Sequence, residues 1–154
     1  MIAEGKAEPM LSVMADGNTS GSGGIASFGE KNLKAFENEL LHSVIPEVES
    51  NYRVKDEPSG RALAGLSMGG LQTLYVGIKN TNLFNYLGVF SSGWFGNRPE
   101  ISKSHYEILE SDTEKINKDL KVFWIAMGGQ EDIAYNNCQL MLKKAHMIIL
   151  GIKE

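Results

Sequence analysis

Several kinds of residue are scarce in this sequence, and each scarcity excludes a class of protein. Cys138 is the only cysteine among 154 residues, so one chain holds neither a disulfide framework nor a Cys-x-x-Cys metal or redox site. Basic residues are not in excess, because 15 Lys and Arg stand against 19 Asp and Glu, for a net charge of -4. A nucleic-acid partner is therefore not expected.

Long apolar runs are also absent from the sequence. No run approaches the roughly 20 residues that a bilayer-spanning helix needs, so no membrane association is expected. The opening segment, MIAEGKAEPM, has neither the charged nor the apolar region of a signal peptide, and the sequence leaves the cellular compartment open. The composition, 42% hydrophobic and 22% charged, is typical of a globular chain about one domain in length.

Short apolar runs alternate with helical patterns along the chain. Continuous apolar runs are typical of strands buried on both faces, and helices show apolar residues three and four positions apart. The alternation predicts an α/β chain in which helices cover both faces of a mostly parallel sheet of about four strands. Nothing marks a second domain, so residues 1–154 are expected to form one. The predicted strands are 10–15, 61–66, 86–92 and 121–127, and the predicted helices are 30–50, 70–79 and 134–150.

Local signals add detail to this pattern. Pro46 should kink the first predicted helix, because its missing N–H removes the hydrogen bond to residue 42. The polar region 97–118 has a weak pattern and is expected to be loop with one short helix. Gly151 follows the last predicted helix and suits a left-handed C-terminal cap.

One segment carries a catalytic pattern. Gly65-Leu66-Ser67-Met68-Gly69 has the form G-x-S-x-G and lies where a predicted strand meets a predicted helix, which is the setting of a nucleophilic serine. Ser67 would occupy a sharp, strained turn, across which side chains at the two flanking glycines would collide. The N–H of Met68 would point from the helix start toward an oxyanion. The alternative is a serine in a glycine-rich turn without chemistry.

A nucleophilic serine needs a base, and the base needs an orienting carboxylate. The segment KVFWIAMGGQED supplies a carboxylate after a predicted strand, at the same edge of the sheet as Ser67. Asp132 is the preferred acid because it directly precedes a predicted helix, and Glu131 is the close alternative. The other interpretation is that one of these side chains only caps that helix.

The three histidines do not suit the role of base. His42 and His105 both precede the acid in the chain, which is the wrong order for this architecture. His146 follows Asp132 by fourteen residues, and a helix of that length would carry it roughly 20 Å from the catalytic edge. A hydrogen bond to Ser67 needs about 3 Å. The base is expected on a loop after one more strand, which would begin near Gly151, so the catalytic histidine is expected to be missing from this chain.

Five segments together resemble the esterase family of α/β-hydrolases. They are DGNTS, SVIPEVESNYRV, RALAGLSMGGLQTL, VFSSGWF and FWIAMGGQED, and the resemblance runs from about Lys6 to Glu154. The branch that looks most similar is the carbohydrate esterases, namely feruloyl esterases and acetyl xylan esterases, which remove acyl groups from plant xylan. The resemblance implies Ser67 as nucleophile, the Met68 amide as oxyanion donor and Asp132 as acid. Trp94 and Phe95 match a loop beside the acyl pocket, although Trp94 suits a core-packing role equally well.

The chain also departs from the family pattern. Family members have earlier strands with an HG-type loop that supplies a second oxyanion donor, and their catalytic histidine lies in a later segment. The resemblance therefore implies a partial α/β-hydrolase fold that lacks the first strands and the last strand, either a fragment truncated at both ends or a product that begins at an internal methionine. Esterase activity should be reduced or absent, and exposed sheet edges favour a homo-oligomer. The implied substrate is a small-molecule or polysaccharide ester, with no cofactor and no metal, and full-length relatives are expected to be secreted or periplasmic.

Other functions remain as alternatives. Residues 21–26, GSGGIA, fit the dinucleotide pattern G-x-G-x-x-A, but they lie beyond the tight turn that the fingerprint needs, and no acidic residue ends the next predicted strand. A carbohydrate-binding or interaction protein that keeps the hydrolase fold without catalysis is the second alternative. Within the same family, S-formylglutathione hydrolase-like and enterochelin esterase-like branches are further alternatives.

Overall fold

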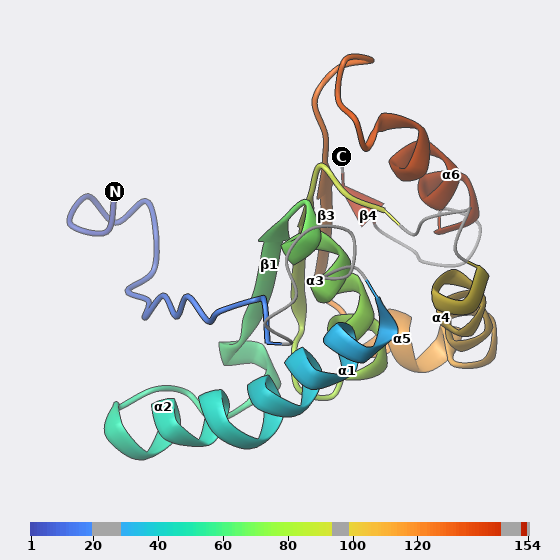
Figure 1. Cartoon of the computed structure of the whole chain (residues 1–154). Coiled ribbons are helices and arrows are strands. Elements are labelled where there is room, and N and C mark those ends of the chain that lie inside the picture. Colours follow the sequence, from blue (N-terminus) through green and yellow to red (C-terminus); the bar gives the residue numbers. More distant parts are fainter. Residues whose placement is uncertain (20–28, 94–98, 146–151, 154) are drawn as a thin grey trace.

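The computed structural model describes residues 1–19, 29–93, 99–145 and 152–153 (Figure 1). Its elements alternate between helices and parallel strands, as the apolar pattern predicts. In chain order they are α1 (Glu30–Glu39), the π-helical turn η2 (Leu40–Val44), α2 (Ile45–Asn51), the 3₁₀ turn η3 (Pro58–Gly60), β1 (Ala62–Leu66), α3 (Met68–Lys79), β2 (Tyr86–Phe90), α4 (Pro99–Ser111), α5 (Thr113–Asp119), β3 (Val122–Ala126), α6 (Tyr135–Ala145) and β4 (Ile152–Lys153).

The four strands form one parallel sheet in the order β1-β2-β3-β4. Leu63, Leu87 and Phe123 lie side by side in this register, on the face against which α3 packs. Helix α3 is buried along almost its whole length, because α1 and α4 pack on it in turn. The core therefore lies between the sheet and a layer of helices.

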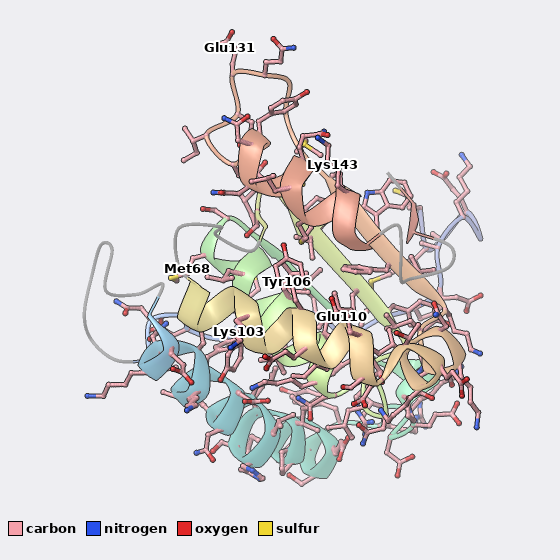
Figure 2. The ribbon with its side chains drawn as sticks, turned by 90° about the vertical axis from the view of Figure 1, so that its right-hand side faces the viewer. Met68, Lys103, Tyr106, Glu110, Glu131 and Lys143 are labelled. Atoms are coloured by element: carbon pink, nitrogen blue, oxygen red, sulfur yellow. The ribbon has the colours of Figure 1, made fainter. Side chains whose placement is uncertain are left out.

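The opposite face of the sheet is open in the described part of the chain. Leu66 is 67% exposed and Trp124 is 44% exposed, although both belong to strands. In Figures 1 and 2 the helices α1, α3, α4 and α6 all lie on one side of the sheet. The prediction of helices on both faces is thus wrong for the residues that the structure describes, whereas the predicted parallel sheet with flanking helices is confirmed.

The first predicted strand is also wrong. Residues 10–15 pair with no described strand and lie in the exposed N-terminal segment, where Met14 is 92% exposed. An apolar run forms a strand of a sheet only if its N–H and C=O groups make hydrogen bonds with a neighbouring strand. Residues 10–15 do not pair with the edge of β1, and an apolar pattern does not indicate which strand would be the partner. The fourth strand of the sheet is instead β4, at residues where the sequence predicted a further strand to begin.

The region 97–118 contains two helices where one short helix in a loop was expected. Its apolar residues are few, but Leu109 on α4 and Ile116 on α5 lie seven residues apart and are fully buried. Helix α5 is further fixed by Thr81, whose hydroxyl donates to Asp119 at 2.9 Å and accepts from Lys115 at 2.8 Å. Tyr106 and Ile108 of α4 also pack against the core, so a mainly polar segment is anchored by a few apolar side chains.

The long first helix changes its hydrogen bonding just before Pro46. The Ile45 N–H donates to the Leu40 carbonyl, five residues back, and α-helical bonding resumes with Pro46 in the first turn of α2. Proline lacks the N–H that an uninterrupted α-helix would use there. The hydrogen bonding thus changes at Pro46 through a π-helical turn, and the predicted kink stays a prediction. The end of the last predicted helix, with His146 and Gly151, lies outside the described residues.

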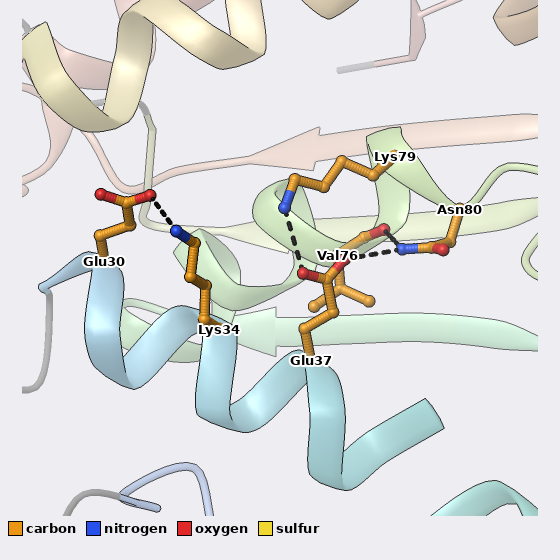
Figure 3. A network of polar contacts seen from close by, with 6 residues as sticks. All are labelled: Glu30, Lys34, Glu37, Val76, Lys79 and Asn80. Atoms are coloured by element: carbon orange, nitrogen blue, oxygen red, sulfur yellow. Dashed lines mark hydrogen bonds and ion pairs between the residues drawn. The ribbon is translucent and has the colours of Figure 1, made fainter. Parts of the chain in front are cut away.

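Helix α1 is held on α3 by a small polar network (Figure 3). The Glu37 carboxylate accepts from Lys79 Nζ at 3.1 Å and from Asn80 Nδ2 at 3.1 Å. Asn80 also donates to the Val76 carbonyl at 2.8 Å, which ties the network to the C-terminal end of α3. The ion pair between Glu30 and Lys34, by contrast, lies within α1 and is exposed. The end of α3 remote from Ser67 is therefore fixed by charge as well as by apolar packing.

Candidate active site

Ser67 occupies the single residue between β1 and α3. Its backbone has φ 55° and ψ -112°, a left-handed conformation that is rare for any residue with a side chain. The Ser67 N–H donates to the Phe90 carbonyl at 2.8 Å, and its own carbonyl accepts from the Leu71 N–H at 3.1 Å. Its hydroxyl makes no cap on α3, and the residue is exposed. The surrounding sheet and helix thus hold the serine in a strained turn with its side chain in reach of a ligand.

The glycines around Ser67 differ in the space that a side chain would have at each position. A Cβ added at Gly65 would lie 2.2 Å from the carbonyl carbon of Gly69, so only glycine fits at position 65. A Cβ at Gly70 would lie 2.5 Å from the Cβ of Ser92, in the loop that follows β2. At Gly69 a Cβ would meet no atom within 4 Å. The expected collision is therefore found on one side of the serine, and the expectation for Gly69 is wrong.

Met68 is the first residue of α3. The N–H groups of a first helical turn have no partner within the helix, and the helix dipole adds positive character there. Both properties suit the predicted role of the Met68 N–H as an oxyanion donor, and that role stays a prediction.

Asp132 lies in the loop between β3 and α6, and its carboxylate accepts two backbone hydrogen bonds. Its Oδ2 accepts from the Gly128 N–H at 2.9 Å and its Oδ1 from the Ala134 N–H at 2.8 Å. The Ser91 side chain, first, and the Ala134 and Gly128 N–H groups hold the pKa of the carboxyl below its ordinary value of 3.8. The carboxylate is therefore ionised and fixed in direction at neutral pH.

The alternative acid, Glu131, is placed differently. It lies at the outer end of the loop above α6, and Figure 2 shows it well apart from Met68 and pointing away from the body of the protein. Its side chain is exposed. The geometry therefore favours Asp132 over Glu131 as the acid, as the sequence analysis did, without testing the role itself.

The loop at residues 16–19 is part of the site, although the sequence analysis gave it no role. The Gly17 carbonyl accepts from Gln72 Nε2 at 2.6 Å and from Asn32 Nδ2 at 3.2 Å, two side chains that are almost fully buried. A Cβ at Gly17 would lie 3.3 Å from the Met68 Cε. The loop is thus clamped beside the first turn of α3. Asn32 and Gln72 are polar residues on the inward faces of helices, which is the signal that could have revealed the clamp.

The histidines offer no base in the described part of the site. His42 lies in η2, between α1 and α2, and Figure 1 shows α2 beyond the end of the sheet opposite to that where β1 leads into α3. His105 is on α4, where only its backbone is described, and His146 lies outside the described residues. Trp94, Phe95 and the segment 21–26 also lie outside them.

The described ranges contain neither a candidate metal centre nor a membrane-spanning helix. Within the described ranges, no group of three or more His, Cys, Asp and Glu side chains is placed to hold a metal ion. No helix in the same ranges is long and apolar enough to cross a membrane.

A strained serine between a parallel strand and a helix, in a sheet with helices against it, defines the chain as an α/β-hydrolase fold. The chain belongs to the esterase family whose model, described as "Putative esterase", matches residues 15–145.

Individual relatives agree with this assignment. An endo-1,4-beta-xylanase/feruloyl esterase of Xylanibacter ruminicola is 36% identical over 95 residues, which cover 62% of this chain and 13% of that protein. The uncharacterized protein YbbA of Bacillus subtilis is 28% identical over 118 residues, or 75% of this chain and 44% of that protein. The solved feruloyl esterase module from Clostridium thermocellum, complexed with sinapinate, has 30% sequence identity and a TM-score of 0.57, covering 73% of this chain and 43% of that chain. This chain therefore spans less than half the length of each of these relatives.

Proposed function

We propose that this chain supplies the nucleophile and the acid of a serine carboxylic-ester hydrolase that acts on feruloyl or acetyl esters of xylan. The observation that carries the proposal is the backbone of Ser67, held in the left-handed region between β1 and the first turn of α3. The relatives supply the substrate class, since one combines a xylanase with a feruloyl esterase and another was complexed with sinapinate.

Each step of the proposed reaction uses a group with a defined place in the site. Ser67 Oγ attacks the ester carbonyl carbon while a base takes the hydroxyl proton, and the Met68 N–H stabilises the resulting oxyanion. Collapse of this intermediate breaks the bond to the sugar oxygen, which leaves as an alcohol with the proton from the base. Water then attacks the acyl group on Ser67, which releases the carboxylic acid and restores the serine. Asp132 orients the base by accepting its second N–H.

The base of this mechanism is an imidazole, and no histidine side chain that the structure describes lies beside Ser67. The proposal therefore includes slow turnover for this chain alone. Removing the base of a catalytic triad removes most of the rate, while the serine and the oxyanion donor retain a small part of it.

One observation favours a second function, carbohydrate binding without catalysis. The hydrogen bonds of Asp132 to Gly128 and Ala134 give this carboxylate a role in shaping its own loop, whether or not it takes part in a reaction. A hydrolase fold that keeps its loops and has no base would still present a substrate-shaped surface. Related esterase branches, S-formylglutathione hydrolase-like and enterochelin esterase-like, differ from the first proposal only in the ester.

Labelling with a fluorophosphonate tests the proposal, because the reagent modifies an activated serine. The expected result is a label on the peptide that contains Ser67, together with slow release of ferulate from methyl ferulate or acetate from an activated acetate ester. Ser67→Ala is the control and should lose both signals. An unlabelled Ser67 in a folded chain that binds feruloylated xylo-oligosaccharides would favour the binding function instead.

A further inference from the structure

Residues 91–93, called the spacer below, lie between the two halves of the candidate active site. Ser91 follows β2 directly and has φ 45°, and in the described part of the chain Ser67 and Ser91 are the non-glycine residues with positive φ. Backbone strain of this kind persists only where surrounding contacts impose it, and it concentrates at functional sites. The contacts of the spacer therefore indicate what the strain at Ser91 is for.

Two backbone hydrogen bonds join the strand ends around the spacer. The Ser67 N–H donates to the Phe90 carbonyl at 2.8 Å, which fastens the turn of the candidate nucleophile to the end of β2. The Ser91 N–H donates to the Ala126 carbonyl at 2.8 Å, which fastens the start of the spacer to the end of β3. The chain after β3 leads into the loop that carries Asp132. The spacer thus begins between the strand ends that lead to the nucleophile and to the acid.

Ser92 packs directly on the first turn of α3. A Cβ added at Gly70 would lie 2.5 Å from the Ser92 Cβ and 3.1 Å from its Oγ, so Ser92 fills the space that a side chain at position 70 would need. Ser92 is only 2% exposed, and its hydroxyl has no hydrogen-bond partner among the described groups. A buried hydroxyl without a hydrogen bond adds no stability. What this side chain contributes is therefore the contact of its atoms with α3.

Gly93 packs just as closely on the first turn of α6. A Cβ at Gly93 would lie 2.8 Å from the carbonyl carbon and oxygen of Asn137 and 2.9 Å from the Cys138 nitrogen. Helix α6 begins at Tyr135, shortly after Asp132. Glycine at position 93 therefore lets the backbone of the spacer approach the backbone of the helix that follows the acid. One short segment contacts both the helix after the nucleophile and the helix after the acid.

We propose that the spacer positions Ser67 and Met68 relative to Asp132 in the ester hydrolysis inferred above, with Ser92 as the positioning residue that sets how closely the first turn of α3 approaches. This inference rests on the proposed function. Ser92 acts only through α3, whose first N–H group is the proposed oxyanion donor. A displacement of about 1 Å at a reacting group can cost on the order of 100-fold in rate. The contact at Ser92 should therefore matter for the reaction beyond its part in packing.

Moving the contact from position 92 to position 70 tests the proposal. Gly70→Ala places a Cβ against Ser92 and pushes α3 away from the spacer. Labelling of Ser67 by the fluorophosphonate, with imidazole added as the base, should then slow roughly tenfold to 100-fold. When Gly70→Ala is combined with Ser92→Gly, the new methyl group takes the place of the Ser92 Cβ, and most of the rate should return.

Gly77→Ala is the matched control. A Cβ at Gly77 would lie 2.5 Å from the Leu87 Cδ2, so this variant perturbs the packing of the same helix on the same strand, near the end of α3 remote from Ser67. Labelling of the folded Gly77→Ala chain should proceed at the rate of the unmodified chain. A merely structural role of Ser92 predicts instead that Gly70→Ala and Gly77→Ala behave alike.

A second readout is the ³¹P chemical shift of the phosphonate bound to Ser67. The phosphonyl oxygen takes the place of the oxyanion, so the shift reports on the donors around it, the Met68 N–H among them. The shift should change in Gly70→Ala, return in the double variant and stay unchanged in Gly77→Ala.

The outcomes separate the inference from the function on which it rests. Equal labelling rates in Gly70→Ala and Gly77→Ala overturn the inference, and so does a double variant that stays as slow as Gly70→Ala. Ser92→Gly alone adds no atom and takes the place of Gly70→Ala if that variant does not fold: it should be labelled more slowly than Gly77→Ala, and an equal rate overturns the inference. If Ser67 of the unmodified chain resists the label even with imidazole, the proposed function fails and the inference fails with it.

Discussion

The Ser67 N–H donates a hydrogen bond to the Phe90 carbonyl at 2.8 Å, so the turn that carries the candidate nucleophile is fastened to the end of the neighbouring strand. A hydrogen bond across the sheet fixes the backbone of Ser67 but leaves its hydroxyl free. The strain in this turn is therefore supported by the sheet and by α3, and stability and reactivity can be varied separately at this position.

Replacing Ser67 with glycine should stabilise the fold and abolish reactivity. Glycine adopts φ 55° without the steric cost that serine has there, so we expect a gain of about 1–2 kcal/mol in the free energy of unfolding. Urea denaturation measures the gain, and fluorophosphonate labelling measures the loss. Ser67→Ala should lose the label without becoming more stable. Equal stability of the two variants would show that the left-handed turn costs little.

The two glycines of the G-x-S-x-G pattern should respond differently to alanine. Gly65→Ala places a Cβ against the Gly69 backbone, where nothing flexible can move aside, and should cost about 1–3 kcal/mol or more. Gly69→Ala meets open space within the first turn of α3 and should be neutral or stabilising by up to about 1 kcal/mol. Urea unfolding of both variants checks the contrast, and similar losses in both would contradict it.

Removing the Glu37 carboxylate should loosen α1 from α3. The side chains of Glu37 and Lys79 are only 20% and 25% exposed, so Glu37→Ala leaves a half-buried ammonium and the Asn80 amide without this partner. A loss of about 1–3 kcal/mol is expected. Glu30→Ala is the matched control on the same helix, since its ion pair with Lys34 is exposed and should be dispensable. Chemical denaturation of both variants at the same pH provides the comparison.

Asp132 should make the stability of the fold depend on pH in the acid range. Its pKa is lowered in the folded state, mainly by the Ser91 hydroxyl, so the folded state binds the proton less tightly than the unfolded state does. The stabilisation is complete above the ordinary carboxyl value and disappears as the pH falls through the lowered pKa. Asp132→Asn should therefore be less stable than the unmodified chain at neutral pH, and the two should converge in acid. Unfolding curves of both chains at a series of pH values test this, and a constant difference in stability across the acid range would contradict it.

The open face and free edge of the sheet should promote self-association. Leu66, Phe90 and Trp124 are exposed on the face that no described helix covers, and among the described strands β1 has a neighbour on one side only. We expect an average mass that rises with concentration in sedimentation velocity experiments, and a smaller rise in Trp124→Gln. A single monomeric species at high concentration would count against this prediction.

Sequence reasoning located the parts of the fold in which local pattern and packing agree. The strand before Ser67 and the helix after it were predicted because the apolar run, the glycines and the helical spacing all point to one structure. Residues 10–15 failed because their pattern was right for a strand but their pairing depended on a neighbour that the pattern cannot name. In the polar segment 97–118 the helices are anchored by a few apolar side chains, among them the buried Leu109 and Ile116.

The site was predictable to the same extent. Ser67 and Asp132 could be proposed from their positions after strands, since the carboxyl ends of parallel strands meet at one edge. The positive φ of Ser91 could not be predicted, because it follows from the fold and not from a local pattern. The clamp of Asn32 and Gln72 on Gly17 likewise joins three segments that are distant in sequence.

From that clamp we expect an order in which the parts of the site assemble. The Gly17 carbonyl binds one side chain from α1 and one from α3, so loop 16–19 gains its anchors only after these two helices have packed together. It should consequently be the last part of the site to form and the first to open, without any strand of the sheet coming apart. Hydrogen exchange at loop 16–19 should then be faster than in β1 and should report on access to the Ser67 turn.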